Sequence, residues 1–201
     1  MRKISAHYIF PVSRPPLKFG ILILEDDGTV VDIIDTQGKF EEKEGIEFYS
    51  GILVPGFINS HTHLELSWMH KRLPEKFDGM ADFFKKFLAL RFSYNGPVED
   101  EIQTGDAFML QEGTVAVGDI SNSTDTFKTK QQSPIRYYSF IEFFGLGESL
   151  ADELYSKSLK NYDLAKTMGL AAGLTPHAPY TMSGRAFELL KIWHNNHPQE
   201  A

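Results

Sequence analysis

Two histidines separated by one residue, His61 and His63, are the side chains in this sequence best suited to chemistry. They follow an apolar segment at residues 52–60, which predicts a strand. Alternate side chains share one face of a strand, so both imidazoles would point the same way and Thr62 the opposite way. Because neutral imidazole binds zinc and iron, the pair predicts two ligands of one metal ion at the carboxyl end of a strand.

The amino-acid composition limits which residues can bind a metal and which partners the protein can have. The sequence has no cysteine, so any metal ligands must be histidines and carboxylates. A net charge of −7 without a strong basic patch argues against nucleic-acid binding. No segment approaches the ~18 apolar residues of a membrane span, and the N-terminus does not resemble a signal peptide. We therefore expect a cytoplasmic protein that acts on a small molecule, with no nucleic-acid or membrane partner.

The pattern of apolar residues changes along the chain. Two β-rich segments, 19–24 and 29–34, flank a turn that ends in Asp27-Gly28, which predicts a hairpin. From residue 51 on, strands alternate with helices, which predicts parallel strands joined by right-handed crossovers. The expected helices lie at 79–92, 98–112, 150–168 and after the N-cap Ser183, and the later strands at 114–120, 135–144 and 170–176. We divide the chain into a β-subdomain at 1–50 and an α/β domain at 51–201.

Three segments resemble, in the right order, motifs of the amidohydrolase superfamily. Residues 53–63 (LVPGFINSHTH) resemble its first barrel strand, 113–119 (GTVAVGD) its second, and 173–181 (GLTPHAPYT) the segment after its fourth. Residues 61–67 (HTHLELS) look most like the branch that holds aminofutalosine, S-adenosylhomocysteine and guanine deaminases and the chlorohydrolases. The resemblance implies an N-terminal portion of such a protein: part of a small β-sandwich, then about four βα units, the first half of a (β/α)₈ TIM barrel.

The resemblance also implies an activity. It points to a metal-dependent hydrolase of a non-peptide C–N bond, most closely a deaminase of an amine or amidine in a purine-like or other heterocyclic molecule. One divalent metal, zinc in preference to iron, would lower the pKa of bound water to give hydroxide. A general acid/base would move the proton to the departing ammonia. His61 and His63 would supply two of the metal ligands.

The rest of that family's site has no counterpart in this sequence. The family supplies a further His, a catalytic Glu, a second His and an Asp from strands five, six and eight, and none is identified here. We therefore assign no catalytic residue to this chain. Since a catalytic zinc normally has three protein ligands, the sequence predicts half a metal site on a truncated chain that is inactive alone.

Four residues are candidates for binding the substrate. His177 lies in the Pro-His-Ala-Pro segment, where a substrate contact is favoured over a histidine set by turn geometry. Glu65 either orients substrate or a water, or is a surface carboxylate at the start of a loop, and both alternatives stay open. Trp68 and Glu142 are weaker candidates of the same kind.

Two further features have alternative interpretations. Asp119 ends a predicted strand, where it would belong to a polar layer beneath the site or act as a simple cap. Phe83, Phe84 and Phe87 recur at helical spacing, which predicts core packing, although helices of the first loop line the substrate cavity in the resembling family.

Two non-enzymatic alternatives remain. A half-barrel would leave two open sheet edges and an uncovered apolar face, so the chain would fold only by self-association or with a complementary segment. We accordingly expect a homo-oligomer formed through that exposed surface. A small doubly wound α/β binding protein is disfavoured, because the sequence lacks a glycine-rich phosphate loop.

Overall fold

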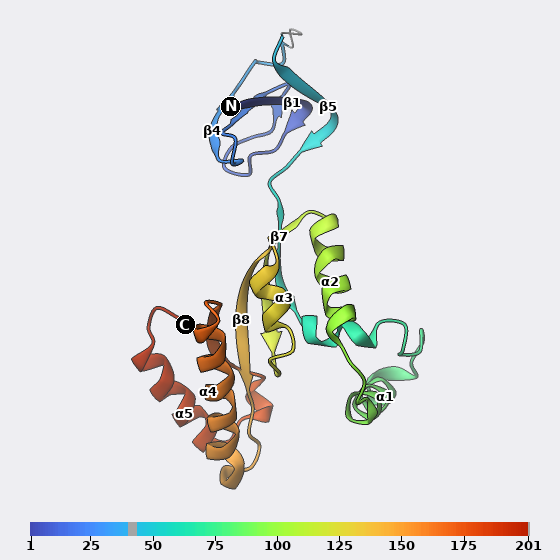
Figure 1. The fold of residues 1–201 in the computed structure, drawn as a ribbon, viewed down its shortest axis with the longest axis vertical. Coiled ribbons are helices and arrows are strands. Elements are labelled where there is room, and N and C mark those ends of the chain that lie inside the picture. The colour runs from blue at the N-terminus through green and yellow to red at the C-terminus, as the bar shows by residue number, and fades with distance from the viewer. Residues whose placement is uncertain (40–43, 201) are drawn as a thin grey trace. The chain divides into compact units, whose positions relative to one another are not determined.

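A computed structural model describes residues 1–39 and 44–200 of the chain. The chain divides into two compact units, Met1–Gly56 and Phe57–Ala201 (Figure 1). The first unit is all β and the second is α/β, so the expected change of architecture along the chain is present. No helix in the described ranges is both long enough and apolar enough to cross a membrane.

The first unit is one five-stranded sheet. Its strands are β1 (Arg2–Ile9), β2 (Leu17–Lys18), β3 (Ile21–Leu24), β4 (Val30–Ile34) and β5 (Ile46–Leu53). β1 pairs antiparallel with β2 and β3, and β3 pairs antiparallel with β4 across the Asp-Gly turn. The predicted hairpin is therefore confirmed. Gly28 has φ +88°, the left-handed backbone that glycine adopts most easily in such a turn.

The boundary between the units lies later than residue 50. β5 runs parallel to β1 as far as Leu53, and the backbone N–H of Phe10 donates to the carbonyl of Leu53 at 2.9 Å. Hydrogen bonding thus places residues 51–53 in the first sheet. The apolar segment 52–60, expected as one strand, is in fact divided between β5 and β6, with Pro55 and Gly56 in between.

The second unit is built on a four-stranded parallel sheet in the order β6-β7-β8-β9. Its strands are β6 (Phe57–Thr62), β7 (Thr114–Ser121), β8 (Arg136–Phe143) and β9 (Ala171–Pro176). The α-helices are α1 (Gly79–Ser93), α2 (Glu99–Gln111), α3 (Phe127–Gln132), α4 (Ala151–Thr167) and α5 (Gly184–Asn196). Short 3₁₀ helices are η1 (Leu64–Met69), η2 (Glu148–Leu150) and η3 (Pro179–Thr181). The predicted α/β class is confirmed.

Helices cover one face of this sheet. α2 packs on β7, and α4 packs on β8 and β9 (Figure 1). Along β7 and β8 every second residue is buried, Val117, Asp119 and Ser121 on one strand and Tyr137, Ser139, Ile141 and Phe143 on the next. The residues between them, which point to the other face, are only partly buried. The sheet therefore has one face packed against the helices and one open face.

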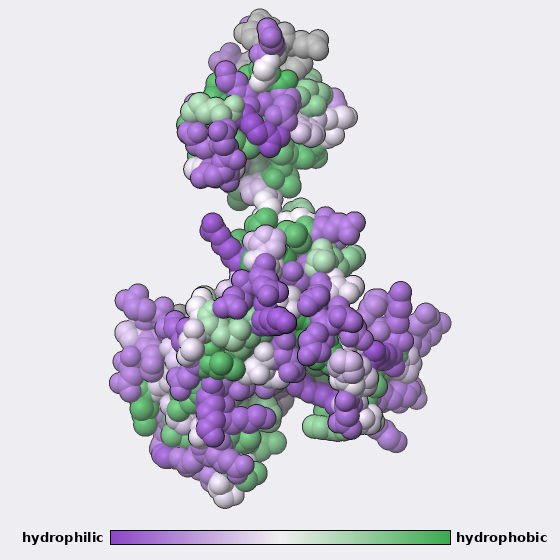
Figure 2. Space-filling model, in the orientation of Figure 1, coloured by the Kyte–Doolittle hydropathy of each residue, from purple (hydrophilic) through white to green (hydrophobic). Residues whose placement is uncertain are grey.

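Helix α1 corrects the expectation that its phenylalanines form core. The helix spans the predicted range, but none of its residues is buried, and Phe84 is 51% exposed. Phe83 contacts Phe77, Phe84 and Phe87 through its ring, so the aromatic residues pack largely on one another. Apolar side chains also lie at the surface among hydrophilic ones in the view of Figure 2. The helical spacing was right, but spacing does not say whether a neighbouring element covers the apolar stripe.

Helix α5 begins as the sequence predicts. The Ser183 hydroxyl accepts a hydrogen bond from the backbone N–H of Ala186 at 3.2 Å, which is the geometry of an N-cap. The buried face of the helix carries Leu190 and Trp193 into the larger core cluster, whereas Phe187 is 45% exposed. Trp193 meets the ring of Tyr162 edge-on at 5.3 Å, so α5 is fastened to α4 by an aromatic contact.

The substitution Trp193→Ala is expected to lower the free energy of unfolding by about 3–5 kcal/mol, because it removes a large buried side chain and leaves a cavity. Urea denaturation followed by far-ultraviolet circular dichroism measures the change. Phe187→Ala, on the exposed side of the same helix, is the matched control and is expected to cost about 0.5 kcal/mol. Equal losses in the two variants would contradict the packing of α5.

Candidate functional site

The two histidines of the HTH motif lie where β6 ends. His61 is in the strand, and His63 is the residue between the strand and η1. Their ring centroids are 5.3 Å apart with an interplanar angle of 74°. The Nδ1 atom of His63 is buried and has no hydrogen-bond partner, which is costly for a polar atom. An unpaired imidazole nitrogen next to a second imidazole suits a divalent metal ion.

The structure also limits that site. Within residues 1–39 and 44–200, no group of three or more histidine, aspartate or glutamate side chains is placed to hold a metal ion. Catalytic zinc normally needs three protein ligands and keeps a fourth position open. The described residues thus fit part of a metal's coordination shell and do not complete it.

Asp119 lies on the helix-covered face of the sheet, behind the histidines. Its neighbour in the β6–β7 register is Thr62, which points away from the face that His61 and His63 share. One carboxylate oxygen accepts a hydrogen bond from the backbone N–H of Leu64 at 2.7 Å. Both alternatives proposed for Asp119 are therefore combined: it lies beneath the HTH motif and caps the start of η1.

Lys130 was not singled out from the sequence. Its Nζ atom lies 2.6 Å from Asp119 Oδ2, and the side chains of both residues are fully buried. Burial lowers the pKa of the Lys130 ammonium, and the neighbouring Asp119 carboxylate opposes that shift. Lys130 is on α3, a six-residue helix whose sequence, FKTKQQ, has too short an apolar pattern to predict a helix. Without the helix, nothing in the sequence indicates that this lysine is buried.

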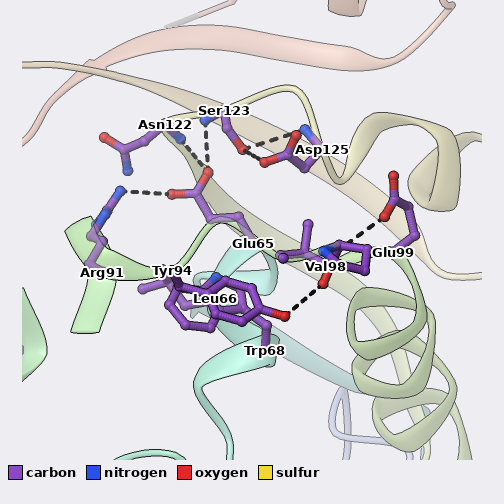
Figure 3. A pocket seen from close by; sticks show the side chains of 12 residues that line it. Glu65, Leu66, Trp68, Arg91, Tyr94, Val98, Glu99, Asn122, Ser123 and Asp125 are labelled. Atoms are coloured by element: carbon purple, nitrogen blue, oxygen red, sulfur yellow. Dashed lines mark hydrogen bonds and ion pairs between the residues drawn. The ribbon is translucent and has the colours of Figure 1, made fainter.

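Glu65 is a buried link between three segments. Its side chain is 4% exposed, and Oε2 accepts hydrogen bonds from the backbone N–H groups of Asn122 at 2.9 Å and Ser123 at 2.8 Å. Oε1 lies 3.3 Å from the guanidinium of Arg91 on α1. The alternative of a surface carboxylate is therefore wrong. Glu65 ties η1 to the loop after β7 and to α1 (Figure 3).

Trp68 is buried on η1 and stacks on Tyr94, with ring centroids 4.3 Å apart. The Arg72 guanidinium lies 4.5 Å from the centre of the Tyr94 ring, within range of a cation–π interaction. These aromatic residues and Glu65 line a cavity of about 380 Å³ (Figure 3). Its other lining residues are Leu66, Arg91, Gly96, Pro97, Val98, Glu99, Asn122, Ser123 and Asp125.

His177 and Glu142 form a pair in a second cavity, of about 470 Å³. His177 directly follows β9, and its Nδ1 atom lies 2.6 Å from Glu142 Oε1 near the end of β8. The histidine side chain is 43% exposed, whereas the carboxylate is 8% exposed. Phe84 and Phe87 of α1 line the same cavity. The buried carboxylate therefore holds an imidazole that remains accessible from an apolar cavity.

The predicted site residues thus lie in three places. His61 and His63 lie at the end of β6, Glu65 and Trp68 line the first cavity, and Glu142 and His177 line the second. Arg91 and Asn122 line both cavities, so the two are neighbours. Neither residue was identified from the sequence, because their positions depend on Glu65, which contacts Arg91 and the backbone of Asn122.

Replacing Glu65 tests its linking role. Glu65→Ala is expected to lower the free energy of unfolding by about 2–3 kcal/mol, because two backbone donors and a guanidinium lose their shared acceptor. Denaturant unfolding gives the energy, and amide hydrogen exchange at Asn122 and Ser123 gives the location. Glu65→Gln is the matched control, since its one carbonyl oxygen keeps an acceptor for the loop. Unchanged exchange at both amides in the alanine variant would contradict the link.

Comparisons with known proteins show which proteins this chain resembles. No protein-family model matches the chain. Adenosine deaminase of Helicobacter pylori is 31% identical over 176 residues, 80% of this chain and 41% of the relative. The 5-methylthioadenosine/S-adenosylhomocysteine deaminase of Saccharophagus degradans is 27% identical over 210 residues, 94% of this chain and 45% of the relative. The chain thus spans less than half the length of these curated relatives.

Solved structures share the fold. Helicobacter pylori aminofutalosine deaminase in complex with methylthio-coformycin superposes with a TM-score of 0.79 at 23% identity, over 98% of this chain and 49% of that one. Atrazine chlorohydrolase TrzN of Arthrobacter aurescens, complexed with zinc and atraton, gives 0.71 at 18% identity, over 98% and 51%. The predicted resemblance is confirmed: this chain is similar to the N-terminal region of curated deaminases, and it shares its fold with solved deaminase and chlorohydrolase structures.

Proposed function

We propose that this chain forms the N-terminal part of a metal-dependent hydrolase that removes an amino group from a heterocyclic small molecule. The observation that carries the proposal is the His61–His63 pair, in which one buried ring nitrogen has no protein partner. The four parallel strands would be the first half of a (β/α)₈ barrel, whose active sites lie at the carboxyl ends of the strands. The remaining ligands and the proton-transfer group would lie outside the described residues.

The roles of the residues follow from their contacts. His61 and His63 would hold one divalent ion, zinc or iron, which when bound lowers the pKa of water enough to supply hydroxide near neutral pH. Glu142 would accept a hydrogen bond from Nδ1–H of His177, which leaves Nε2 of that imidazole to bind substrate in the second cavity. Glu65 holds Arg91 at the junction of the two cavities.

The substrate class rests on the relatives and on the second cavity. The relatives include deaminases of adenosine, 5'-deoxyadenosine and aminodeoxyfutalosine, which share a purine-type amine. A volume of about 470 Å³ lies in the range of small-molecule sites. Its lining combines phenylalanine rings with one histidine–carboxylate pair, which suits a flat heteroaromatic ring that also makes hydrogen bonds.

Zinc titration of the purified chain tests the metal site. Weak binding of one zinc ion per chain is expected, because the two imidazoles supply only part of a coordination shell. His63→Ala should weaken binding on the order of tenfold or more. His194→Ala, on α5, is the control and should bind zinc like the unaltered chain. Equal zinc binding by all three proteins would contradict the site.

An assay of ammonia release from adenosine and 5'-deoxyadenosine tests the reaction. We expect no release by the zinc-loaded 201-residue chain, since no three ligand side chains among the described residues are placed to hold the metal ion. Release is expected from a natural polypeptide that contains this chain together with a second half of the barrel, and His63→Ala should abolish it. Rapid turnover by the 201 residues alone would contradict the proposal that the rest of the active site lies outside this chain.

A second candidate function, a non-enzymatic half-barrel that self-associates, is favoured by one observation. β6 and β9 are the outer strands of the described parallel sheet, and on β6 the side chains of Phe57 and Ile58 are 59% and 73% exposed. Exposed apolar edge strands pair readily with another chain. Light scattering at micromolar concentration should therefore show a dimer or larger species, and Ile58→Lys should shift it towards the monomer. A well-behaved monomer of the unaltered chain would contradict this candidate.

A further inference from the structure

A small polar cluster is buried behind the HTH motif, on the face of the sheet opposite the two imidazoles. It consists of Asp119 and Ser121 on β7, Ser139 on β8 and Lys130 on α3. The Lys130 ammonium lies 2.6 Å from Asp119 Oδ2 and donates hydrogen bonds at 2.9 Å to the hydroxyls of Ser121 and Ser139. An ammonium has three donors, so each of them has a partner in this cluster.

A buried ion pair of this kind adds little net stability to a fold. Removing two charges from water is costly, and replacing a buried ion pair by apolar residues of similar volume is often neutral or stabilising. Removing only one partner is strongly destabilising. What the pair holds in place is therefore more informative than its net contribution to stability.

The pair holds the turn that follows His63. Asp119 Oδ2 faces Lys130 and Ser121, while Oδ1 accepts the backbone N–H of Leu64, the residue next to His63, at 2.7 Å. His63 is in the N-cap position of η1, yet its side chain makes no capping hydrogen bond. An N-cap side chain normally accepts a backbone N–H from the first turn of its own helix. Here Asp119, from the neighbouring strand, supplies an acceptor to that turn.

Because Asp119 supplies this acceptor, the His63 imidazole does not make a capping hydrogen bond. Its Nδ1 atom is buried without a partner, although the residue stands where a side chain would usually cap the helix. The backbone at His63 (φ −125°, ψ 78°) is followed directly by the anchored N–H of Leu64. The backbone next to the imidazole is thus anchored by a carboxylate that lysine and serine contact.

We propose that Asp119 and Lys130 are positioning residues that orient His63 for metal binding. The proposal rests on the proposed function, since His63 is taken as a metal ligand. Asp119 acts through the N–H of Leu64, and Lys130 acts by fixing the carboxylate. Neither touches the metal or the substrate.

Two double variants separate the hydrogen bond from the ion pair. D119N/K130M removes both charges but keeps a carbonyl oxygen at position 119 that can accept from Leu64. D119L/K130M removes the charges and the acceptor together at similar volume. Ser121→Ala is the matched control, because it removes a hydroxyl that contacts both charged groups but not Leu64.

The first measurement needs no metal. Amide hydrogen exchange at Leu64 and the ring resonances of His63 are recorded by NMR on the 201-residue chain. Exchange at Leu64 is expected to be at least tenfold faster in D119L/K130M, with shifted His63 signals, and close to that of the unaltered chain in D119N/K130M and in Ser121→Ala. A Leu64 amide that exchanges as fast in the unaltered chain as in an unfolded peptide would overturn the proposal, even if D119L/K130M fails to fold.

Zinc affinity is the second measurement. D119L/K130M is expected to bind zinc at least tenfold more weakly than the unaltered chain, and D119N/K130M within threefold of it. Equal affinity in the two double variants, with zinc bound through His63, would overturn the positioning role. If the NMR results are as expected but the unaltered chain binds no zinc, the orientation of His63 by Asp119 stands and the proposed metal site fails.

Discussion

The carboxylate of Asp119 is the point on which the arrangement of the second unit depends. One oxygen binds the first N–H of η1 and the other binds a buried lysine from α3, so η1, β7 and α3 meet at a single side chain. In a dry interior such bonds are strong and their loss is costly. The end of the HTH motif is therefore held against β7 by polar contacts together with the apolar cluster that contains Leu64 and Val117. The helices α4 and α5 are held by apolar packing around Trp193.

Glu65, which lines the first cavity, plays a similar structural role. It too is a buried carboxylate whose two oxygens bind different segments, in this case backbone N–H groups of the loop after β7 and the guanidinium of Arg91. Asp119 binds the backbone N–H of Leu64, and the side chain of the next residue, Glu65, binds the loop and Arg91. The short helix η1 is therefore held at its first two residues. Loops that bear binding residues need such support, because they lack the regular hydrogen bonds of helices and strands.

Periodic patterns predicted the regular elements, and isolated contacts could not be predicted. The helices at α1, α2, α4 and α5, the hairpin and the strands β7 to β9 follow from apolar spacing, turns and caps. The boundary near residue 56 did not, because one apolar segment serves two sheets that the Pro55-Gly56 dipeptide separates. In the site, the HTH pair was predicted from its two-residue spacing. The burial of Glu65 and the partner of Asp119 depend on tertiary contacts, and Lys130 lies on a helix too short to show a period.

In helix α1, the residues that line a cavity are not the residues that stabilise the fold. Its phenylalanines line a cavity, yet none of its residues is buried in the core. Most substitutions in a protein are limited by the stability they cost, and that cost is smallest where little surface is buried. Natural variants could therefore exchange the aromatic side chains of α1 for others with little penalty in folding. Homologous proteins could then diverge in the molecules they accept while keeping the sheet, Asp119 and Glu65 intact.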